Sequence, residues 1–362
     1  MSDTQELKTE RQNAAKYARD LVAKELSAGV GGSVSVKSGG QIAIGSSKVP
    51  SGVSSENADP HDALLRDLSG KTRLKGKQHI SEAERRSHAK VIRDCDRASA
   101  VVHASPPYAC TLANLGKPIP ASHYLVAFAG PQVPVAEYSS PGRELADRAL
   151  DALAESCNAC LLKKDGMLSV GATLEAAFER ALRVEQCARI YYQATSVGEP
   201  TFLPDQELVR LEAEFENYGQ SQNQPETPEP NPELQDERQS IADLGGQMLS
   251  ANLVKGTGGS ISVRRGDKLA INPSGVPYEE VTADSVPILT VGGKEVAGRS
   301  KSSTAAPMHA HLHRRVEDAK AIVQVRSPYA TTFASLGEPI PASHRHAAVT
   351  GGEVPVVPYE KP

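Results

Sequence analysis

The sequence contains no tryptophan, and aromatic residues make up only 4% of its 362 residues. Alanine and branched aliphatic side chains must therefore fill the hydrophobic cores, as is usual in layered α/β domains. The polar N-terminus lacks the apolar stretch of a signal peptide, and no apolar run reaches the roughly eighteen residues of a membrane span. We therefore expect a cytoplasmic protein that does not enter a membrane.

The chain also lacks an excess of basic charge, since 40 basic residues face 44 acidic ones and the net charge is −4. This balance gives no electrostatic reason to expect a nucleic acid or an acidic membrane surface as a partner. The five cysteines are odd in number, which favours reduced thiols over a disulfide framework. Cys157 and Cys160 form a single C-x-x-C, for which we favour a structural role, with redox or metal binding as the alternative.

One stretch of the sequence occurs twice. S-P-Y-A-T-T-F-A-S-L-G-E-P-I-P-A-S-H occupies 327–344, and P-P-Y-A-C-T-L-A-N-L-G-K-P-I-P-A-S-H occupies 106–123. A spacing of roughly 220 residues is too long for a solenoid unit, so it predicts two tandem copies of one domain. We place the copies at 6–218 and 235–362. The segment 219–234, rich in proline and polar residues, is predicted to be a semi-extended linker.

Each copy is predicted to begin with the same elements. In the first copy a helix over 6–27 leads through a glycine-rich turn into a hairpin formed by 34–37 and 41–44 around Gly39-Gly40. In the second copy the corresponding segments are a helix over 241–249, a turn over 256–260 and a hairpin formed by 261–263 and 269–271. A helix with His88 or His309 then precedes a predicted buried strand, at 100–103 or 321–324.

The first copy continues beyond the repeated stretch with further predicted elements. They are a strand over 133–137, a helix over 143–155, two strands within 159–170 and a long helix over 174–194. The second copy reaches Pro362 without a counterpart to these later elements. The second copy is therefore expected to be an incomplete duplicate.

The order of the motifs resembles the class II aldolase and adducin head-domain family. The second copy has G-G-S at 258–260, P-S-G at 273–275, K-S-S at 301–303 and V-P-V-V-P-Y at 354–359, and the first copy adds L-L-K-K-D-G at 161–166. A tail over 202–219 is similar to that of fuculose-phosphate aldolases. The resemblance implies a three-layer α/β/α domain on a mostly antiparallel central sheet. It also implies an assembly, usually tetrameric, with active sites between neighbours.

The resemblance further implies a divalent metal, usually zinc, held by an H-x-H pair and a third histidine, with a glutamate that moves a proton. In the first copy His103 matches the first ligand and Glu84 matches the glutamate, but Ser105 and Asp165 replace the other two histidines. A zinc or manganese ion bound weakly by His103 and Asp165 is one interpretation. The alternative is a core histidine that binds no metal. Tyr124 matches a family tyrosine that donates a proton in the adjacent subunit's site, and a surface or interface tyrosine is its alternative.

Two carboxylates in one metal-free pocket would repel each other. If Glu84 and Asp165 share such a pocket, we expect one of their pKa values to be raised.

In the family, phosphate binds to the glycine turn, the P-S-G turn and the K-S-S turn through backbone N–H groups and hydroxyls. The first copy has Ser47-Lys48 in the second of these turns and Glu82 in the third, where a carboxylate is expected to repel phosphate. The second copy keeps the pattern, and its predicted anion-binding residues are Gly259, Ser260, Ser274, Gly275, Ser303, Thr304 and Arg326.

The second copy has lost the residues for metal-dependent chemistry. Ala305 replaces the glutamate, and Gln324 and Arg326 replace the H-x-H pair. A guanidinium at position 326 suits a carboxylate or phosphate, or it pairs with an acidic residue at an interface. His309, His311 and His313 cannot share one face of a helix, so we expect a partly solvated helix there and no metal site.

Two functions follow as hypotheses. The first is a non-catalytic ligand-binding or assembly protein, because both copies have lost ligands. The alternative is a lyase, isomerase or epimerase that acts on a small phosphorylated or carboxylated sugar through Glu84, His103, Asp165 and Tyr124.

Assembly is predicted from the tyrosines of the first copy. Tyr124 and Tyr218 match residues that complete a neighbour's site in the family, whereas the second copy has Arg345 at the first of these positions. We therefore predict a homodimer whose four domains form a pseudo-fourfold ring. A small anionic ligand is expected in the cleft between unlike domains.

Overall fold

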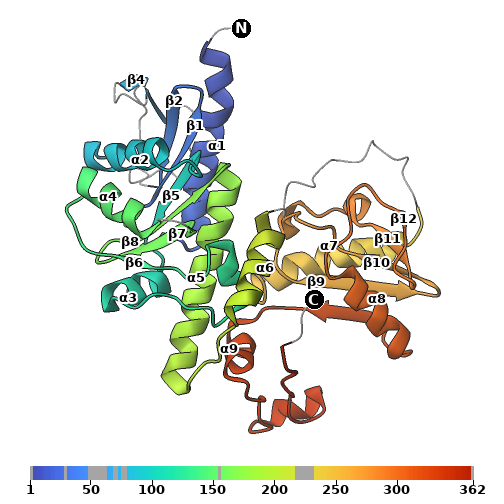
Figure 1. The fold of residues 1–362 in the computed structure, drawn as a ribbon. Coiled ribbons are helices and arrows are strands. Elements are labelled where there is room, and N and C mark those ends of the chain that lie inside the picture. Colours follow the sequence, from blue (N-terminus) through green and yellow to red (C-terminus); the bar gives the residue numbers. More distant parts are fainter. Residues whose placement is uncertain are drawn as a thin grey trace. The chain divides into compact units, whose positions relative to one another are not determined.

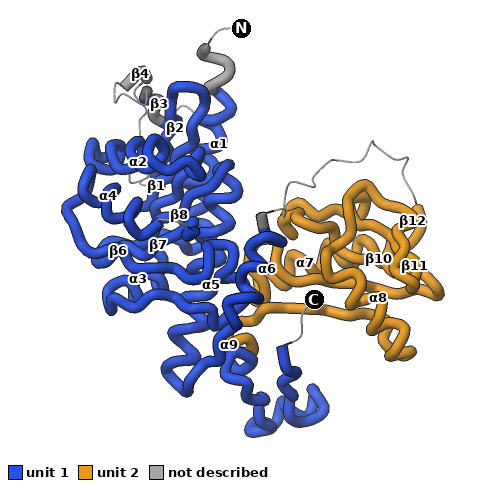
Figure 2. Tube along the Cα trace, viewed as in Figure 1, with its two compact units in different colours: residues 1–216, 332–362 blue, residues 217–331 orange. Residues whose placement is uncertain are grey.

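The computed structural model describes residues 3–27, 31–47, 63–67, 72–74, 80–153, 156–216 and 232–359. The chain forms two compact units (Figures 1 and 2), one made of 1–216 with 332–362 and the other of 217–331. The end of the predicted second copy therefore belongs to the first unit. Of the predicted linker over 219–234, residues 219–231 lie outside the described residues. None of the described helices is both long enough and apolar enough to cross a membrane.

The first unit is built on an eight-stranded sheet with the strand order β4-β3-β2-β1-β5-β8-β7-β6. Its strands are β1 (Ser33–Ser38), β2 (Gln41–Ser46), β3 (Leu64–Asp67), β4 (Thr72–Leu74), β5 (Ala100–Ala104), β6 (Val135–Ala136), β7 (Ala159–Leu162) and β8 (Gly166–Gly171). Only β6 and β7 run parallel; the other neighbouring strands are antiparallel. The predicted hairpin around Gly39-Gly40 and the mostly antiparallel sheet are confirmed.

Helices cover both faces of this sheet (Figure 1). One hydrophobic core includes residues of α1 (Asp3–Ala23), α3 (Pro107–Leu115), α5 (Leu174–Val197), α6 (Asp205–Glu216) and the short helix η3 (Tyr124–Phe128). The other core includes residues of α2 (Glu82–Asp94) and α4 (Arg143–Ala152). Val102 packs in the first core and Val101 in the second, because successive side chains of a strand point to opposite faces. The three-layer α/β/α architecture is thereby confirmed.

Helix α1 ends earlier than predicted. Glu25 has a φ of 61°, and the N–H groups of Glu25 and Leu26 donate to the carbonyl oxygens of Val22 and Leu21. These are the two bonds of a Schellman motif, in which one left-handed residue closes the helix. Glycine usually occupies that position, so the glutamate gave no signal in the sequence.

The second unit contains a five-stranded antiparallel sheet with the order β12-β11-β10-β9-β13. Its elements are α7 (Gln235–Ser250), β9 (Ser260–Arg265), β10 (Lys268–Ile271), η4 (Tyr278–Glu280), η5 (Ala283–Ser285), β11 (Ile288–Thr290), β12 (Glu295–Ala297), α8 (Ala306–Arg315) and β13 (Ala321–Gln324). The predicted helix and hairpin at the start of the second copy are confirmed.

Strand β13 was expected to be buried, and that expectation is wrong. Val323 is 46% exposed, whereas every residue of β5 except His103 is buried. The reason is the neighbour: β5 lies between β1 and β8, but among the described residues β13 pairs only with β9. The same type of strand therefore lies inside one sheet and at the edge of the other.

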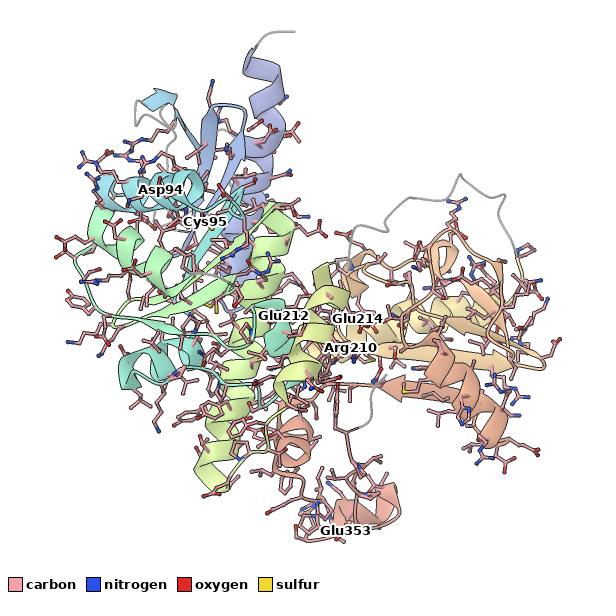
Figure 3. All side chains as sticks on the ribbon, in the orientation of Figure 1. Asp94, Cys95, Arg210, Glu212, Glu214 and Glu353 are labelled. Atoms are coloured by element: carbon pink, nitrogen blue, oxygen red, sulfur yellow. The ribbon has the colours of Figure 1, made fainter. Side chains whose placement is uncertain are left out.

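The segment from residue 332 onward contributes the rest of α9 (Pro328–Leu336) and η6 (Arg345–Thr350) to the first unit. The N–H of Thr201 donates to the carbonyl oxygen of Ser335, at 2.9 Å. The hydroxyl of Tyr359 donates to the buried carboxylate of Glu207 on α6, at 2.6 Å. Arg210, on the same helix (Figure 3), also bonds to Glu207. These contacts attach the segment to the first unit.

Candidate active site

A buried histidine anchors the site region of the first unit. The hydroxyls of Ser33 and Ser35 on β1 bond to Nε2 and Nδ1 of His88 on α2, at 2.9 and 2.7 Å. Burial lowers the pKa of His88 to about 4, so its imidazole is neutral at neutral pH. Because both ring nitrogens are bonded, the ring has a fixed orientation between helix and strand.

The same arrangement recurs in the second unit. The hydroxyls of Ser260 and Ser262 on β9 bond to Nε2 and Nδ1 of His309 on α8, both at 2.7 Å. Strand register also matches, since His103 lies opposite Ser33 in the first unit and Gln324 lies opposite Ser260 in the second. This correspondence supports two copies of one scaffold.

In the first unit, His103 lies between two carboxylates. Its Nδ1 is 3.9 Å from Oε1 of Glu84, and its Nε2 is 3.4 Å from Oδ2 of Asp165. All three side chains are partly buried. The structure therefore brings together the three residues that the sequence predicted for this site.

Local structure places each carboxylate. Glu84 lies in the first turn of α2, where its N–H donates to the N-cap hydroxyl of Ser81, at 3.1 Å. Asp165 lies in the turn between β7 and β8, which passes close to β5. A Cβ at Gly166 would come within 2.2 Å of the carbonyl oxygen of Ala104, so only glycine permits this approach. The turn thereby holds Asp165 beside His103.

Ser105 occupies the position of the second family histidine. Its hydroxyl donates to the backbone oxygen of Asp165, at 3.1 Å. The side chain therefore fastens the turn that carries Asp165 to the end of β5.

The structure bears on the expected repulsion between carboxylates at Asp165. Burial acts to raise the pKa of Asp165, but the imidazole of His103, with Nε2 at 3.4 Å, outweighs burial and holds the pKa below its ordinary value. Asp165 thus does not show the expected rise. The imidazole lies between the two acids, so each acid faces a ring nitrogen.

Among the described residues, the ligand atoms of Glu84, His88 and His103 lie within 4.8 Å of one another. His88 cannot ligate a metal without breaking a buried hydrogen bond to a serine. His103 and Asp165 fit a cation better, because two ligands of one tetrahedral ion lie about 3.4 Å apart when each bond is about 2.1 Å. One imidazole and one carboxylate suit manganese or zinc, with water completing the shell.

The second unit has no such group of ligands among its described residues. The side-chain oxygen of Gln324 accepts a hydrogen bond from Ser260, at 2.8 Å, and Ala305 stands where the first copy has its glutamate. The position of the metal ligand is therefore occupied by an amide that bonds to the serine–histidine scaffold.

The predicted anion-binding turns of the second copy do lie together. The N–H of Ser274 donates to the carbonyl oxygen of Lys301, at 2.9 Å, and the N–H of Ser303 donates to that of Asn272, at 3.1 Å. The hydroxyl of Ser260 bonds to His309 and Gln324. Several donors of the expected cradle are therefore already used within the protein.

The other four residues of the predicted cradle differ in backbone conformation and in exposure. Gly259 has a φ of 85°, and a Cβ there would approach the carbonyl oxygen of Gln324 to 2.8 Å, so close packing alone requires glycine. Gly275 also has a positive φ, Thr304 is exposed, and Arg326 is partly buried. Anion binding by the second copy stays a prediction.

Helix α8 is partly solvated, as predicted, with one buried and one exposed face. His309 and His313 are fully buried and only His311 is exposed. The hydroxyl of Ser262 bonds to both buried rings, with Nε2 of His313 at 2.8 Å. The three rings do not share one face, as predicted, but two residues four positions apart do.

Tyr124 begins η3, where its ring centroid lies 4.7 Å from that of His123 and 6.3 Å from that of Phe215. Tyr218 lies outside the described residues. The role of these tyrosines in a neighbour's site stays a prediction.

The cysteines of the described chain are all free. Cys157 and Cys160 are buried, and burial raises the pKa of the Cys160 thiol to about 12. A thiol that does not ionise is a poor metal ligand and a poor nucleophile. The structural interpretation of the C-x-x-C is therefore the better one.

Two features of the first unit were missed by sequence reasoning. The carboxylate of Glu185 on α5 accepts the N–H groups of Tyr108 and Ala109, at 3.0 and 2.9 Å, at the start of α3. The available signal was Pro106, an N-cap residue that has no side chain able to accept such a bond. The second feature is a group of arginines around Glu82, for which the run E-A-E-R-R at 82–86 was the signal.

Known proteins resemble this chain over most of its length. The model of the class II aldolase and adducin N-terminal domain matches residues 12–192 and 239–362. The 5-deoxy-D-ribulose 1-phosphate aldolase of Bacillus thuringiensis serovar kurstaki is 36% identical over 217 residues, which are 59% of this chain and 99% of that protein. The 5-methylthioribulose-1-phosphate/5-deoxyribulose-1-phosphate aldolase of Rhodospirillum rubrum is 35% identical over 220 residues, or 60% of this chain and 96% of that protein.

Among solved structures, an L-fuculose 1-phosphate aldolase superposes with a TM-score of 0.52 and 35% sequence identity, covering 57% of this chain and 96% of its own. Each of the two matched segments contains one of the serine–histidine scaffolds, with His88 in the first and His309 in the second. The chain is therefore a member of the class II aldolase and adducin N-terminal domain family.

Proposed function

We propose that the first copy is a carbon–carbon lyase that cleaves a small phosphorylated sugar by an aldol reaction. This proposal depends on one observation, namely that the side chains of Glu84 and Asp165 lie on either side of the His103 ring in the first unit. Two relatives named as aldolases of 5-carbon ketose 1-phosphates match nearly their full length to this chain. A ketose 1-phosphate is accordingly the substrate class we favour.

The reaction needs one proton to leave an oxygen and one proton to reach a carbon. The hydroxyl beside the breaking bond loses its proton, the carbon–carbon bond opens to an aldehyde, and its electron pair enters the neighbouring carbonyl as an enediolate. The carboxylate of Glu84 accepts the proton that the hydroxyl loses, and the resulting carboxylic acid gives a proton to the enediolate carbon, which restores the carboxylate. Helix α2 positions this carboxylate through the Ser81 cap, and His88 fixes the helix against β1.

Residues His103 and Asp165 would hold a divalent cation through Nε2 and a carboxylate oxygen, and the cation would supply polarisation of the substrate carbonyl. Ser105 keeps Asp165 in place for this role by its bond to the turn. The neighbouring carboxylate of Glu84 lies on the Nδ1 side of the same ring.

For the second copy we propose a non-catalytic, scaffolding role. It lacks the glutamate, and its Gln324 bonds to Ser260 where the first copy presents His103. The non-catalytic hypothesis thus applies to one copy and not to the whole chain.

The test is an aldol cleavage assay with a panel of 2-ketose 1-phosphates, followed through release of dihydroxyacetone phosphate. Glu84→Gln is expected to lower kcat by about 100-fold or more, the usual effect of losing a proton-transfer residue. Glu175→Gln, at an exposed position of α5, is the matched control and should leave kcat unchanged. Full activity of Glu84→Gln, or no cleavage of any member of the panel by the wild-type protein, would contradict the proposal.

A further inference from the structure

Three arginines surround one glutamate at the start of helix α2. Nη2 of Arg66, on β3, is 3.1 Å from Oε1 of Glu82, and Nη2 of Arg85 is 2.9 Å from Oε2. Nε of Arg86 is 3.0 Å from Oε1. The N-terminus of α2 adds partial positive charge at the same place. We call these four residues the Glu82 cluster.

The Glu82 cluster contains buried donors that the protein does not use. Arg66 is only 5% exposed, yet its Nε and Nη1 have no hydrogen-bond partner among the residues that the structure describes. Within the same residues, Nε of Arg85 is also buried without a partner. A buried, unpaired guanidinium N–H is unfavourable, because water no longer solvates it and no acceptor replaces water. The unused donors of Arg66 therefore mark a place where an acceptor is missing.

The net charge of the Glu82 cluster also favours an acceptor that is negatively charged. Three guanidinium groups share the single carboxylate of Glu82, so the Glu82 cluster carries surplus positive charge. Arginine forks bind the planar or tetrahedral oxygens of carboxylates and phosphates through two donors at once. An oxyanion satisfies both the surplus charge and the unused donors.

We infer that the Glu82 cluster binds an oxyanion of a small ligand, a phosphate monoester or a carboxylate, through Arg66 and Arg85, with Glu82 as an internal counter-ion. Glu82 thus does not simply repel an anion, as the sequence alone suggested, because three cations surround it. Glu82 and Glu84 lie two residues apart in one helical turn, about 3 Å along the axis. The inference rests on the proposed function in one respect, namely that the oxyanion belongs to the sugar substrate.

Titration of the full-length protein with inorganic phosphate and, separately, with acetate tests the inference by calorimetry at constant ionic strength. Saturable binding of phosphate is expected if the ligand is a phosphate monoester, and of acetate if it is a carboxylate. Arg66→Lys keeps the charge but removes the fork, and Arg85→Gln removes a charge; each is expected to weaken binding at least tenfold. Glu82→Gln should strengthen it severalfold, because one negative charge disappears. Arg93→Gln, at the other end of α2, is the matched control.

Phosphate or acetate binding that is equal in Arg93→Gln and Arg85→Gln would overturn the inference, as would the absence of saturable binding to the wild type. Arg85→Gln decides the matter if Arg66→Lys does not fold. Because binding requires neither cleavage nor a cation, these results are separate from the aldol assay. If the wild-type protein cleaves sugar phosphates but binds neither phosphate nor acetate in a saturable way, the inference alone is overturned and the proposed function stands.

Discussion

At the scale of single residues, Glu185 shows how a distant acid can start a helix. Its two carboxylate oxygens accept two backbone N–H groups at the start of α3, so they satisfy donors that a helix cannot satisfy itself. We predict that Glu185→Gln lowers the free energy of unfolding by about 1–2 kcal/mol, the range for losing a cap or a charged acceptor. Urea unfolding measures the change. Glu199→Gln, at an exposed site after α5, is the control, and equal stabilities of the two variants would contradict the prediction.

The residues of the candidate site could be predicted in part. Glu84, His103 and Asp165 were identified because each occupies a position within a repeated or ordered motif, and the structure places them together. Glu185 was not assigned a role, because its partners lie 76 and 77 positions away. Arg66 was missed for a similar reason, since only strand pairing brings β3 to the start of α2.

At the scale of elements, the two helix–strand pairs with buried histidines predict acid sensitivity. Burial lowers the pKa of His309 on α8 to about 4, below the ordinary value of 6.5, and burial also lowers that of His313. The unfolded chain therefore takes up protons first as pH falls. Burying these histidines as neutral rings therefore costs no stability above about pH 6.5. As pH falls toward 4, protonation of the same histidines in the unfolded chain lowers the free energy of unfolding. His88 on α2 acts in the same direction in the first unit.

Urea unfolding at pH 7, 5.5 and 4.5 checks this prediction. The unfolding midpoint should fall with pH over this window, and His313→Gln should reduce the slope. His311→Gln, on the exposed face of α8, should leave the slope unchanged. A midpoint independent of pH between 7 and 4.5 would contradict the buried-histidine account.

The elements themselves were largely predictable where apolar spacing was regular. The hairpins at the start of both copies followed from alternating residues around glycine, and their registers agree. The end of α1 and the exposure of β13 were not predictable. The end of α1 depends on a left-handed backbone conformation at Glu25. The exposure of β13 depends on which strands pair with it, and the local sequence does not indicate strand pairing.

At the scale of the whole molecule, assembly stays a prediction of the sequence. We propose a homodimer of four domains in a pseudo-fourfold ring, with Tyr124 and Tyr218 completing neighbouring sites. Light scattering at micromolar concentration is expected to give twice the chain mass of 38.4 kDa. Tyr124→Phe should keep that mass while lowering cleavage activity. A monomer would remove the basis for shared sites.

The central claim is that one of two similar scaffolds carries the chemistry. His103 and Gln324 occupy equivalent strand positions, opposite Ser33 and Ser260. Comparison of His103→Ala with Gln324→Ala in the aldol cleavage assay tests this claim most directly. The account predicts that kcat/KM falls by about 100-fold or more in His103→Ala. It also predicts that Gln324→Ala keeps its activity within about twofold, since the side chain of Gln324 accepts a hydrogen bond from Ser260 of the scaffold. Equal losses in the two variants, or a larger loss in Gln324→Ala, would contradict it.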